Sequence, residues 1–407
     1  MGKDLFQVSL YHRSNNAALA ATGIFMLVAA ICPQMVRAFE KIALIDSYDF
    51  AHAFDIELNS GTEKILDFVL KTGAETLLWR NQGGGNVRYP SVENPKLEDP
   101  LEKWRIPCST IYGWTRLEKC ETNHLAYALQ ATARRGVTPG IHHTLEQTHY
   151  IFSSTSAWNF DHPQFWCHRK GGTPWAGRCS IAFEKVLEHR LKMVDEMIAM
   201  GGDVFYFDIF RDSRWDPSFE FVEPVCRQWR ELYGCEPPDD PSDERWTRLV
   251  SRHFHRFMRE IRKRLDASGR KIRFLVAISR VRGIDRDDEW RLHAFDWRAL
   301  AAEGVFDGLV ADGISPDPKD PWGSTRRAYE WVVGNSGKAK VYFHCSEYDN
   351  KQNGVPTYMR LTGLSKGDTA RRLLETARDA GGAGVVLECV DPHLYGEEID
   401  KVLREFK

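Results

Sequence analysis

Acidic, basic and imidazole side chains follow the short apolar runs of this sequence, where buried strands would end. Residues 204–207 are apolar and rich in β-forming types, and Asp208 follows them directly. Burying an Asp costs several kcal/mol unless the carboxylate is paired or reaches a solvated cleft. Ligands bind at the carboxyl ends of parallel strands. Asp208 is therefore a candidate site residue, with bracing of the next loop as the alternative role.

Two carboxyl groups on opposite sides of a sugar, one protonated and one ionised, can hydrolyse a glycosidic bond. Asp208 with Glu347 is the first candidate pair, and Asp208 with Asp312 is the second. We expect other polar residues at predicted strand ends to bind a carbohydrate substrate: Asp46, Arg80, Asn81, His142, His143, Arg211, Arg280, His344 and Glu388. The favoured reaction needs no cofactor and no metal.

Two other functions stay open. His142, His143, Asp208 and Glu388 are residue types that bind metals, so a metal-dependent barrel hydrolase or isomerase is one. However, the first predicted strand lacks a His-x-His pair, and the consecutive His142 and His143 should point to opposite faces of their strand. The other is a barrel that binds carbohydrate without cleaving it.

Apolar runs and helical periodicity alternate along the chain, which predicts a parallel α/β fold. Strands are expected at 41–46, 76–79, 137–143, 204–207, 272–279, 306–312, 340–345 and 384–388. Helices are expected at 62–72, 123–135, 181–200, 244–265, 297–303, 325–333, 368–379 and 397–406. Eight such units predict a (β/α)8 TIM barrel with its site at the carboxyl ends of the strands.

The long insertions 82–119, 149–179 and 211–241 all follow strands, as a site at that end of a barrel requires. A doubly wound open sheet is the competing fold. The Gly-x-Gly-x-x-Gly fingerprint of its dinucleotide-binding members is missing after the first predicted strand.

Residues 1–38 predict a secretory signal peptide, followed by one barrel domain over 39–407. Lys3 and Arg13 precede an apolar run at 17–32, and Val36 and Ala38 fit a cleavage site. A transmembrane anchor is the alternative, but the run is short for a bilayer span. We therefore expect a secreted or periplasmic protein with no stable membrane insertion after cleavage.

The cysteines agree with export to an oxidising compartment. Close pairs in predicted loops indicate short-range disulfides, namely Cys108 with Cys120, Cys167 with Cys179, and Cys226 with Cys235. The net charge of −2 gives no reason to expect a nucleic-acid partner. The 13 tryptophans suit a large core and also a cleft that stacks on sugar rings.

Several segments resemble the bacterial family-10-like glycosyl hydrolases, a group within the TIM-barrel glycoside hydrolases. Phe205-Tyr206-Phe207-Asp208 is similar to the strand of that family that ends in Asp, and Phe210-Arg211 to the residues after it. Segments 240–246, 256–262 and 296–307 agree as well, so the resemblance covers roughly residues 183–312. It implies hydrolysis of a polysaccharide or oligosaccharide, with Asp208 as nucleophile or acid/base.

The chain also departs from this family. The sixth predicted strand ends in Ala311-Asp312-Gly313, where relatives often have Pro-Gln. The eighth ends in Glu388, where relatives have an uncharged residue. The resemblance therefore carries over a catalytic role for Asp208 alone.

Overall fold

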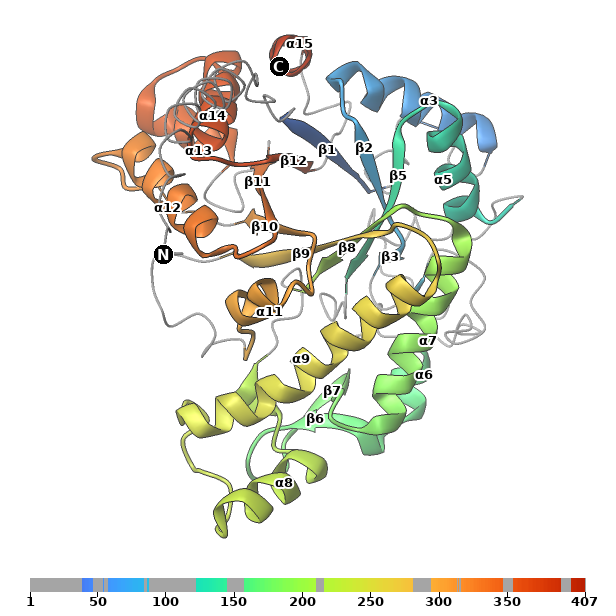
Figure 1. The fold of residues 1–407 in the computed structure, drawn as a ribbon, viewed down its shortest axis with the longest axis vertical. Coiled ribbons are helices and arrows are strands. Elements are labelled where there is room, and N and C mark those ends of the chain that lie inside the picture. Colours follow the sequence, from blue (N-terminus) through green and yellow to red (C-terminus); the bar gives the residue numbers. More distant parts are fainter. Residues whose placement is uncertain are drawn as a thin grey trace, which may run out of the picture. The chain divides into compact units, whose positions relative to one another are not determined.

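Eight parallel strands close into a barrel in the computed structural model (Figure 1). The structure describes residues 39–46, 54, 58–83, 86–87, 122–144, 157–209, 216–280, 294–312, 314, 316–346, 354–388 and 397–406. The strands are β1 (Glu40–Ile45), β2 (Thr76–Arg80), β5 (Thr138–Thr144), β8 (Val204–Asp208), β9 (Arg273–Arg280), β10 (Gly308–Asp312), β11 (Lys340–Ser346) and β12 (Gly384–Glu388). They pair in the closed order β1-β12-β11-β10-β9-β8-β5-β2, which confirms the predicted (β/α)8 barrel.

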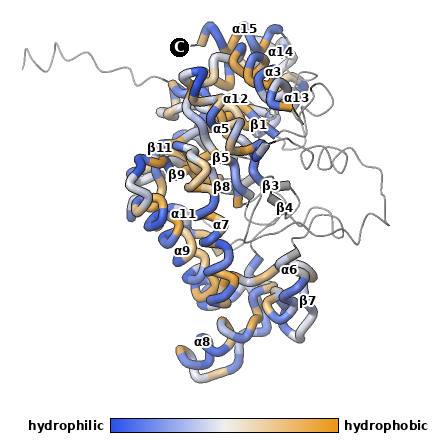
Figure 2. The backbone as a smooth tube through the Cα atoms, turned by 90° about the vertical axis from the view of Figure 1, so that its right-hand side faces the viewer, coloured by the Kyte–Doolittle hydropathy of each residue, from blue (hydrophilic) through white to orange (hydrophobic). Residues whose placement is uncertain are grey.

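A helix lies between each strand and the next, and a last helix follows β12 (Figure 1). These are α3 (Asn59–Val69), α5 (His124–Arg134), α7 (Glu184–Met200), α9 (Glu244–Ala267), α11 (Trp297–Glu303), α12 (Pro321–Asn335), α14 (Lys366–Asp379) and α15 (Glu397–Glu405). In α9, residues Trp246, Phe254 and Phe257 are buried on one face, and Asp243 caps the first turn by accepting from the Arg245 amide. Hydrophilic and hydrophobic residues alternate along these helices in Figure 2.

The insertions after the strands contain regular elements of their own. They include β3 (Gln82–Gly83), β4 (Asn86–Val87), α6 (Ala157–Asp161), β6 (Trp166–His168), β7 (Pro174–Cys179), α8 (Glu223–Tyr233) and α13 (Val355–Thr362), with the short 3-10 helices η1 (Leu70–Thr72), η3 (Pro163–Phe165) and η4 (Pro217–Phe219). The β6–β7 hairpin and α8 lie together beside α9, away from the barrel strands (Figure 1).

The disulfides predicted for Cys167 with Cys179 and for Cys226 with Cys235 are not formed in the structure. The thiol of Cys167 donates to Glu220 Oε1 at 3.3 Å, whereas the Cys179 sulfur lies 4.0 Å from the Asn159 carbonyl oxygen. The two sulfurs of the β6–β7 hairpin are thus directed to different oxygen atoms. Cys108 and Cys120 lie outside the described residues.

Successive side chains of each strand point alternately into the barrel and toward the helices. On β8, the Phe207 ring meets the Phe257 ring of α9 at 6.0 Å, so Phe207 faces the helical layer. Its neighbour Tyr206 faces the interior with Asp208 two residues on. Gly384 lets β12 lie close to β1, because a Cβ at this position would collide with the Glu40 carbonyl oxygen.

An ion pair crosses the interior at the N-terminal ends of the strands. Arg273 of β9 donates to both carboxylate oxygens of Glu40 on β1, at 2.8 and 2.9 Å. The Tyr342 hydroxyl of β11 donates to Glu40 at 2.9 Å, and that of Thr76 on β2 donates to Glu40 at 2.7 Å. Strands that are not neighbours in the barrel are therefore tied together through one carboxylate.

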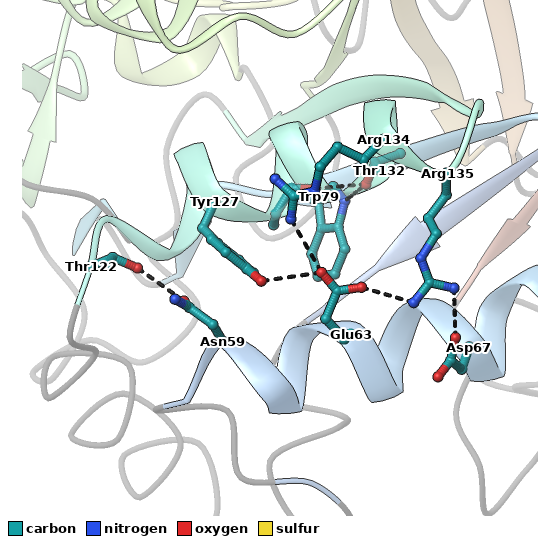
Figure 3. A network of polar contacts seen from close by, with 10 residues as sticks. Asn59, Glu63, Asp67, Trp79, Thr122, Tyr127, Thr132, Arg134 and Arg135 are labelled. Atoms are coloured by element: carbon teal, nitrogen blue, oxygen red, sulfur yellow. Dashed lines mark hydrogen bonds and ion pairs between the residues drawn. The ribbon is translucent and has the colours of Figure 1, made fainter.

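Polar contacts also join neighbouring outer helices. Figure 3 shows Glu63 of α3 accepting from Tyr127 of α5 at 3.1 Å and from Arg135, which follows α5, at 2.8 Å. Figure 3 also shows the indole Nε1 of Trp79 on β2, which donates to the Thr132 hydroxyl of α5 at 2.9 Å. This buried bond fixes α5 against the barrel wall.

Within the described part of the chain, no helix combines the length and the apolar character needed to cross a membrane. The predicted signal peptide, residues 1–38, lies outside the described residues.

Candidate functional site

Polar side chains gather in the barrel at the C-terminal ends of the strands. Asp46 directly follows β1, and Arg80 is the last residue of the neighbouring β2. Their side chains form an ion pair, and both are buried. A guanidinium held by a carboxylate in this way presents its remaining N–H donors in a fixed direction.

Asp208 ends β8, and His142 lies on the adjacent strand β5. The His142 Nε2 atom is 3.6 Å from Asp208 Oδ2, and both side chains are buried. The His142 ring packs on the Tyr206 ring at 5.0 Å. Since Tyr206 and Asp208 share one face of β8, both members of the pair face the barrel interior.

A second imidazole–carboxylate pair lies on the opposite wall. Glu388 ends β12, and His344 is two residues before the end of β11. The His344 Nδ1 atom is 3.4 Å from Glu388 Oε2, and each side chain is 2 % exposed. In the strand order, β12 lies four positions from β8, and β11 lies four positions from β5. The two pairs therefore face each other across the barrel.

His143 and Asn81 do not face the interior, contrary to the predicted role of both in binding substrate. The His143 ring packs on Phe207 at 4.8 Å, and Phe207 faces the helices. Its Nδ1 atom lies 3.1 Å from Asn81 Oδ1, and the Asn81 amide nitrogen faces the Met197 sulfur of α7. Alternation places His142 inside and His143 outside. We therefore leave His143 and Asn81 out of the proposed site.

The surroundings of His143 keep its imidazole neutral. Burial, followed by the charge of Arg190 on α7 and by His142, lowers the pKa of His143 to about 3. A neutral imidazole between a strand and a helix is a packing group with one hydrogen-bonded nitrogen. This property suits structure rather than acid–base chemistry near neutral pH.

Four of the predicted site residues are described in part or not at all. Glu347 and Arg211 lie outside the described residues. Asp312 and Arg280 are the last residues of β10 and β9, so their backbones stand at the C-terminal end of the barrel. Their roles stay predictions.

Two hydroxyl residues that we did not predict share this end of the barrel. Thr144 is paired with Asp208 across β5 and β8, and Ser346 is paired with Glu388 across β11 and β12. Both residues are buried. Side chains alternate along a strand, so a residue two positions after an interior histidine also faces the interior. This alternation is the sequence signal that could have identified both residues.

This arrangement combines carboxylates, imidazoles and a guanidinium at one end of a parallel barrel. Such groups accept and donate hydrogen bonds to hydroxyls and transfer protons to and from oxygen. Over the part of the chain that is described, no three His, Cys, Asp or Glu side chains are grouped so as to hold a metal ion.

No family model matches the chain, and none of the curated proteins does. Solved structures share its fold. A β-galactosidase from the psychrophilic Marinomonas ef1 aligns with a TM-score of 0.55 and 11 % identity over 89 % of this chain and 58 % of that one. The α-L-fucosidase isoenzyme 2 from Paenibacillus thiaminolyticus gives 0.53 and 12 % over 90 % of this chain and 48 % of that one. The α-galactosidase AgaA from Geobacillus stearothermophilus gives 0.51 and 13 % over 91 % and 41 %.

The fold is thus the barrel seen in TIM-barrel glycoside hydrolases. The chain spans about half the length of these proteins. At this level of identity the comparisons establish the fold alone, and the resemblance to the family-10-like glycosyl hydrolases is not confirmed.

Proposed function

We propose that this protein is a glycoside hydrolase that cleaves O-glycosidic bonds of a polysaccharide or oligosaccharide. The observation that carries the proposal is Asp208, a buried carboxyl at the end of β8 that faces the barrel interior beside His142. Ligands of such barrels bind at this end. The barrel fold that the chain shares with a fucosidase and two galactosidases supports the same class of reaction.

In the proposed mechanism Asp208 is one of two catalytic carboxyls. Glu347, which directly follows the last residue of β11, is the first choice of partner, and Asp312 at the end of β10 is the second. In the retaining form, one carboxylate attacks the anomeric carbon while the other carboxylic acid protonates the departing oxygen. Water then cleaves the glycosyl–enzyme ester, and its proton passes to the carboxylate that had acted as acid.

Other interior groups bind the sugar in this proposal. Arg80, oriented by Asp46, donates to hydroxyls, and the His344–Glu388 pair forms polar contacts from the opposite wall. Arg211 and Arg280 remain proposed substrate-binding residues on the strength of the sequence. We further propose export to the periplasm or medium, for which the N-terminal sequence of the mature protein is the test: cleavage after Ala38 leaves Phe39 first.

The activity test uses the full chain on a panel of aryl glycosides and natural oligosaccharides. We expect Asp208→Asn to lower kcat/KM at least about 10³-fold, since it removes a group that acts in the transition state. Asp203→Asn is the matched control. Asp203 lies just before the same strand at the other end of the barrel, where it is paired with Arg270 at 2.8 Å on the surface. This control should keep full activity.

Aryl leaving groups of different acidity identify the second carboxyl. A variant that lacks the general acid still cleaves a glycoside whose phenol leaves without protonation, but it loses activity on sugar leaving groups. Glu347→Gln and Asp312→Asn are compared in this way. If Asp208 is the nucleophile, one of these two variants should show the pattern, and if Asp208 is the general acid, Asp208→Asn should show it instead.

Three results would contradict the proposal. Full activity of a folded Asp208→Asn variant would exclude Asp208 from the reaction. Loss of activity with a chelator, and its return with a divalent cation, would favour the metal-dependent alternative. Glycan binding without release of reducing ends would favour a non-catalytic barrel.

A further inference from the structure

The two adjacent histidines of β5 lie in different surroundings. His143 is on the outer face against Phe207, whereas His142 faces the interior and contacts Tyr206. Asp208 lies two residues beyond Tyr206 on β8, and Tyr206 is level with His142 in the strand register. The His142 imidazole is therefore attached one side-chain layer closer to the N-terminal end than the carboxyl that it contacts.

Burial agrees with this difference in depth. The His142 side chain is 2 % exposed and the Asp208 side chain is 9 % exposed. A substrate that enters from the C-terminal mouth reaches the Asp208 carboxyl before it reaches the imidazole. In the His344–Glu388 pair the imidazole also lies one side-chain layer closer to the N-terminal end than the carboxyl. His344 is level with Val386 in the strand register, and Glu388 is level with Ser346.

Two contacts of the imidazole bear on its role. Its Nε2 atom lies 3.6 Å from Asp208 Oδ2, and the Tyr206 ring packs on the imidazole at 5.0 Å. An Nε2–H group or an imidazolium at this place stabilises the ionised carboxylate of Asp208. Nearby on β2, Arg80 is level with His142, but its guanidinium is paired with Asp46.

We propose that His142 is a positioning residue that acts through Asp208 and makes no contact with the substrate. The proposal rests on the glycoside hydrolase function proposed above and replaces the substrate-binding role predicted for His142 from the sequence. Among the described residues, titratable or charged groups near the pair include Asp46 after β1, Arg80 on β2, Tyr206 on β8, and His143 and Arg190 on the outer side.

Two substitutions of His142 separate positioning from substrate binding. In His142→Gln the amide nitrogen takes roughly the place of Nε2, whereas in His142→Asn the shorter amide cannot reach Asp208. We expect His142→Asn to lower kcat on the order of 10- to 100-fold through misplacement of the carboxyl, with a change in KM below about threefold. His142→Gln should recover much of the loss.

The pH dependence of kcat/KM distinguishes a positioning role of His142 from a purely structural one. Loss of the imidazole removes a group that favours ionised Asp208, so the limb of kcat/KM that reports Asp208 should shift to higher pH in His142→Asn. His143→Asn is the matched control on the outer face of the same strand. It should lower stability without moving that limb.

An increase in KM with unchanged kcat in His142→Asn would show a substrate contact and overturn the proposal. An unchanged pH limb would overturn it too. If the wild-type chain cleaves no glycoside, the proposed function fails on its own. The positioning role is then decided by carbon NMR of labelled aspartate, assigned with Asp208→Asn: the Asp208 carboxyl must titrate at higher pH in His142→Asn than in the wild type, and equal titration overturns the proposal.

Discussion

Both ends of the barrel interior hold a close ion pair, Glu40 with Arg273 at the N-terminal end and Asp46 with Arg80 at the C-terminal end, and the C-terminal end adds two imidazole–carboxylate pairs. At the N-terminal end, Glu40 accepts from Arg273 twice, at 2.8 and 2.9 Å, and from Tyr342 at 2.9 Å. At the C-terminal end, the imidazole–carboxylate distances are 3.6 Å for His142–Asp208 and 3.4 Å for His344–Glu388. These are longer than the roughly 2.7–3.2 Å of an ordinary N–H···O bond.

The difference separates a structural network from a candidate reactive one. Burial would raise the pKa of Glu40, but hydrogen bonds from Arg273, Thr76 and Tyr342 outweigh it and lower the pKa below its ordinary value. Burial and the Glu40 charge raise the pKa of the Tyr342 hydroxyl. Each protonation state is thus fixed at neutral pH, and groups held in this way stabilise a fold. The imidazole–carboxylate pairs at the other end lie instead where ligands of such barrels bind.

The largest effect on stability is expected from Glu40→Gln. The amide cannot accept two bonds from Arg273, which leaves a guanidinium inside the barrel without its charge partner. Removing one member of a buried ion pair costs about 3–5 kcal/mol, and we expect about 3 kcal/mol because the Arg273 side chain is 26 % exposed. Urea unfolding at pH 7, followed by circular dichroism, measures this change.

Glu388→Gln is the matched control at the other end of the interior. It is the same isosteric change, made in a pair with a longer contact. We expect it to lower the free energy of unfolding by less than Glu40→Gln does, because its ion-pair partner is an imidazole at 3.4 Å and not a guanidinium at 2.8 Å. If Glu40→Gln and Glu388→Gln lower the free energy of unfolding equally, the proposed difference between the two ends of the barrel interior is wrong.

A smaller effect is expected from acid, through His143 on the outer face. Its pKa is lowered to about 3 in the folded protein, so the unfolded chain binds the proton more tightly. The stability associated with the neutral imidazole is complete above the unfolded pKa of about 6.5 and declines as the pH falls toward 3. At pH 5 the loss amounts to about 2 kcal/mol.

His143→Asn should remove this part of the pH dependence. The free energies of unfolding of the variant and the wild type should therefore differ less at pH 5 than at pH 7. The Glu40 network does not interfere, because the lowered pKa of Glu40 affects stability only below about pH 4.5. A constant difference between the two proteins at both pH values would show that the folded protein can protonate His143.

The barrel could be predicted from the sequence because each of its signals is local. The run 204–207 followed by Asp208 is β8 in the structure, and the apolar stripe from Trp246 onward is buried in α9. Alternation predicted that at most one of His142 and His143 faces the interior. Which of them does so depends on the packing of Phe207 against α9, and the sequence has no local signal for this contact.

The features that could not be predicted from the sequence depend on contacts between residues that are far apart in the chain. Glu40 and Arg273 are 233 positions apart, and neither lies in a recognisable motif. The spacing of Cys167 and Cys179 suggested a disulfide, but Glu220, 53 residues further on, accepts the hydrogen bond of the Cys167 thiol. The same carboxylate accepts from Ser180 at 2.5 Å and so connects the insertions that follow β5 and β8.

The smallest expected effect concerns a single buried hydrogen bond in the barrel wall. In Thr132→Val, the Trp79 indole loses its acceptor, which now lies at 2.9 Å, while the volume of the side chain is kept. We expect a loss of about 1 kcal/mol in the free energy of unfolding and no change in kcat/KM, because Trp79 faces α5 and not the interior.

If the lost bond is the cause, Thr132→Val should cost less in a Trp79→Phe background, where no N–H group remains to be satisfied. An equal cost in both backgrounds would instead assign the loss to the bond that the Thr132 hydroxyl donates to the Ala128 carbonyl at 2.7 Å. The stability of this part of the barrel wall would then depend on a hydrogen bond within α5. The comparison between the two ends of the barrel would in that case apply only to the polar contacts of the interior.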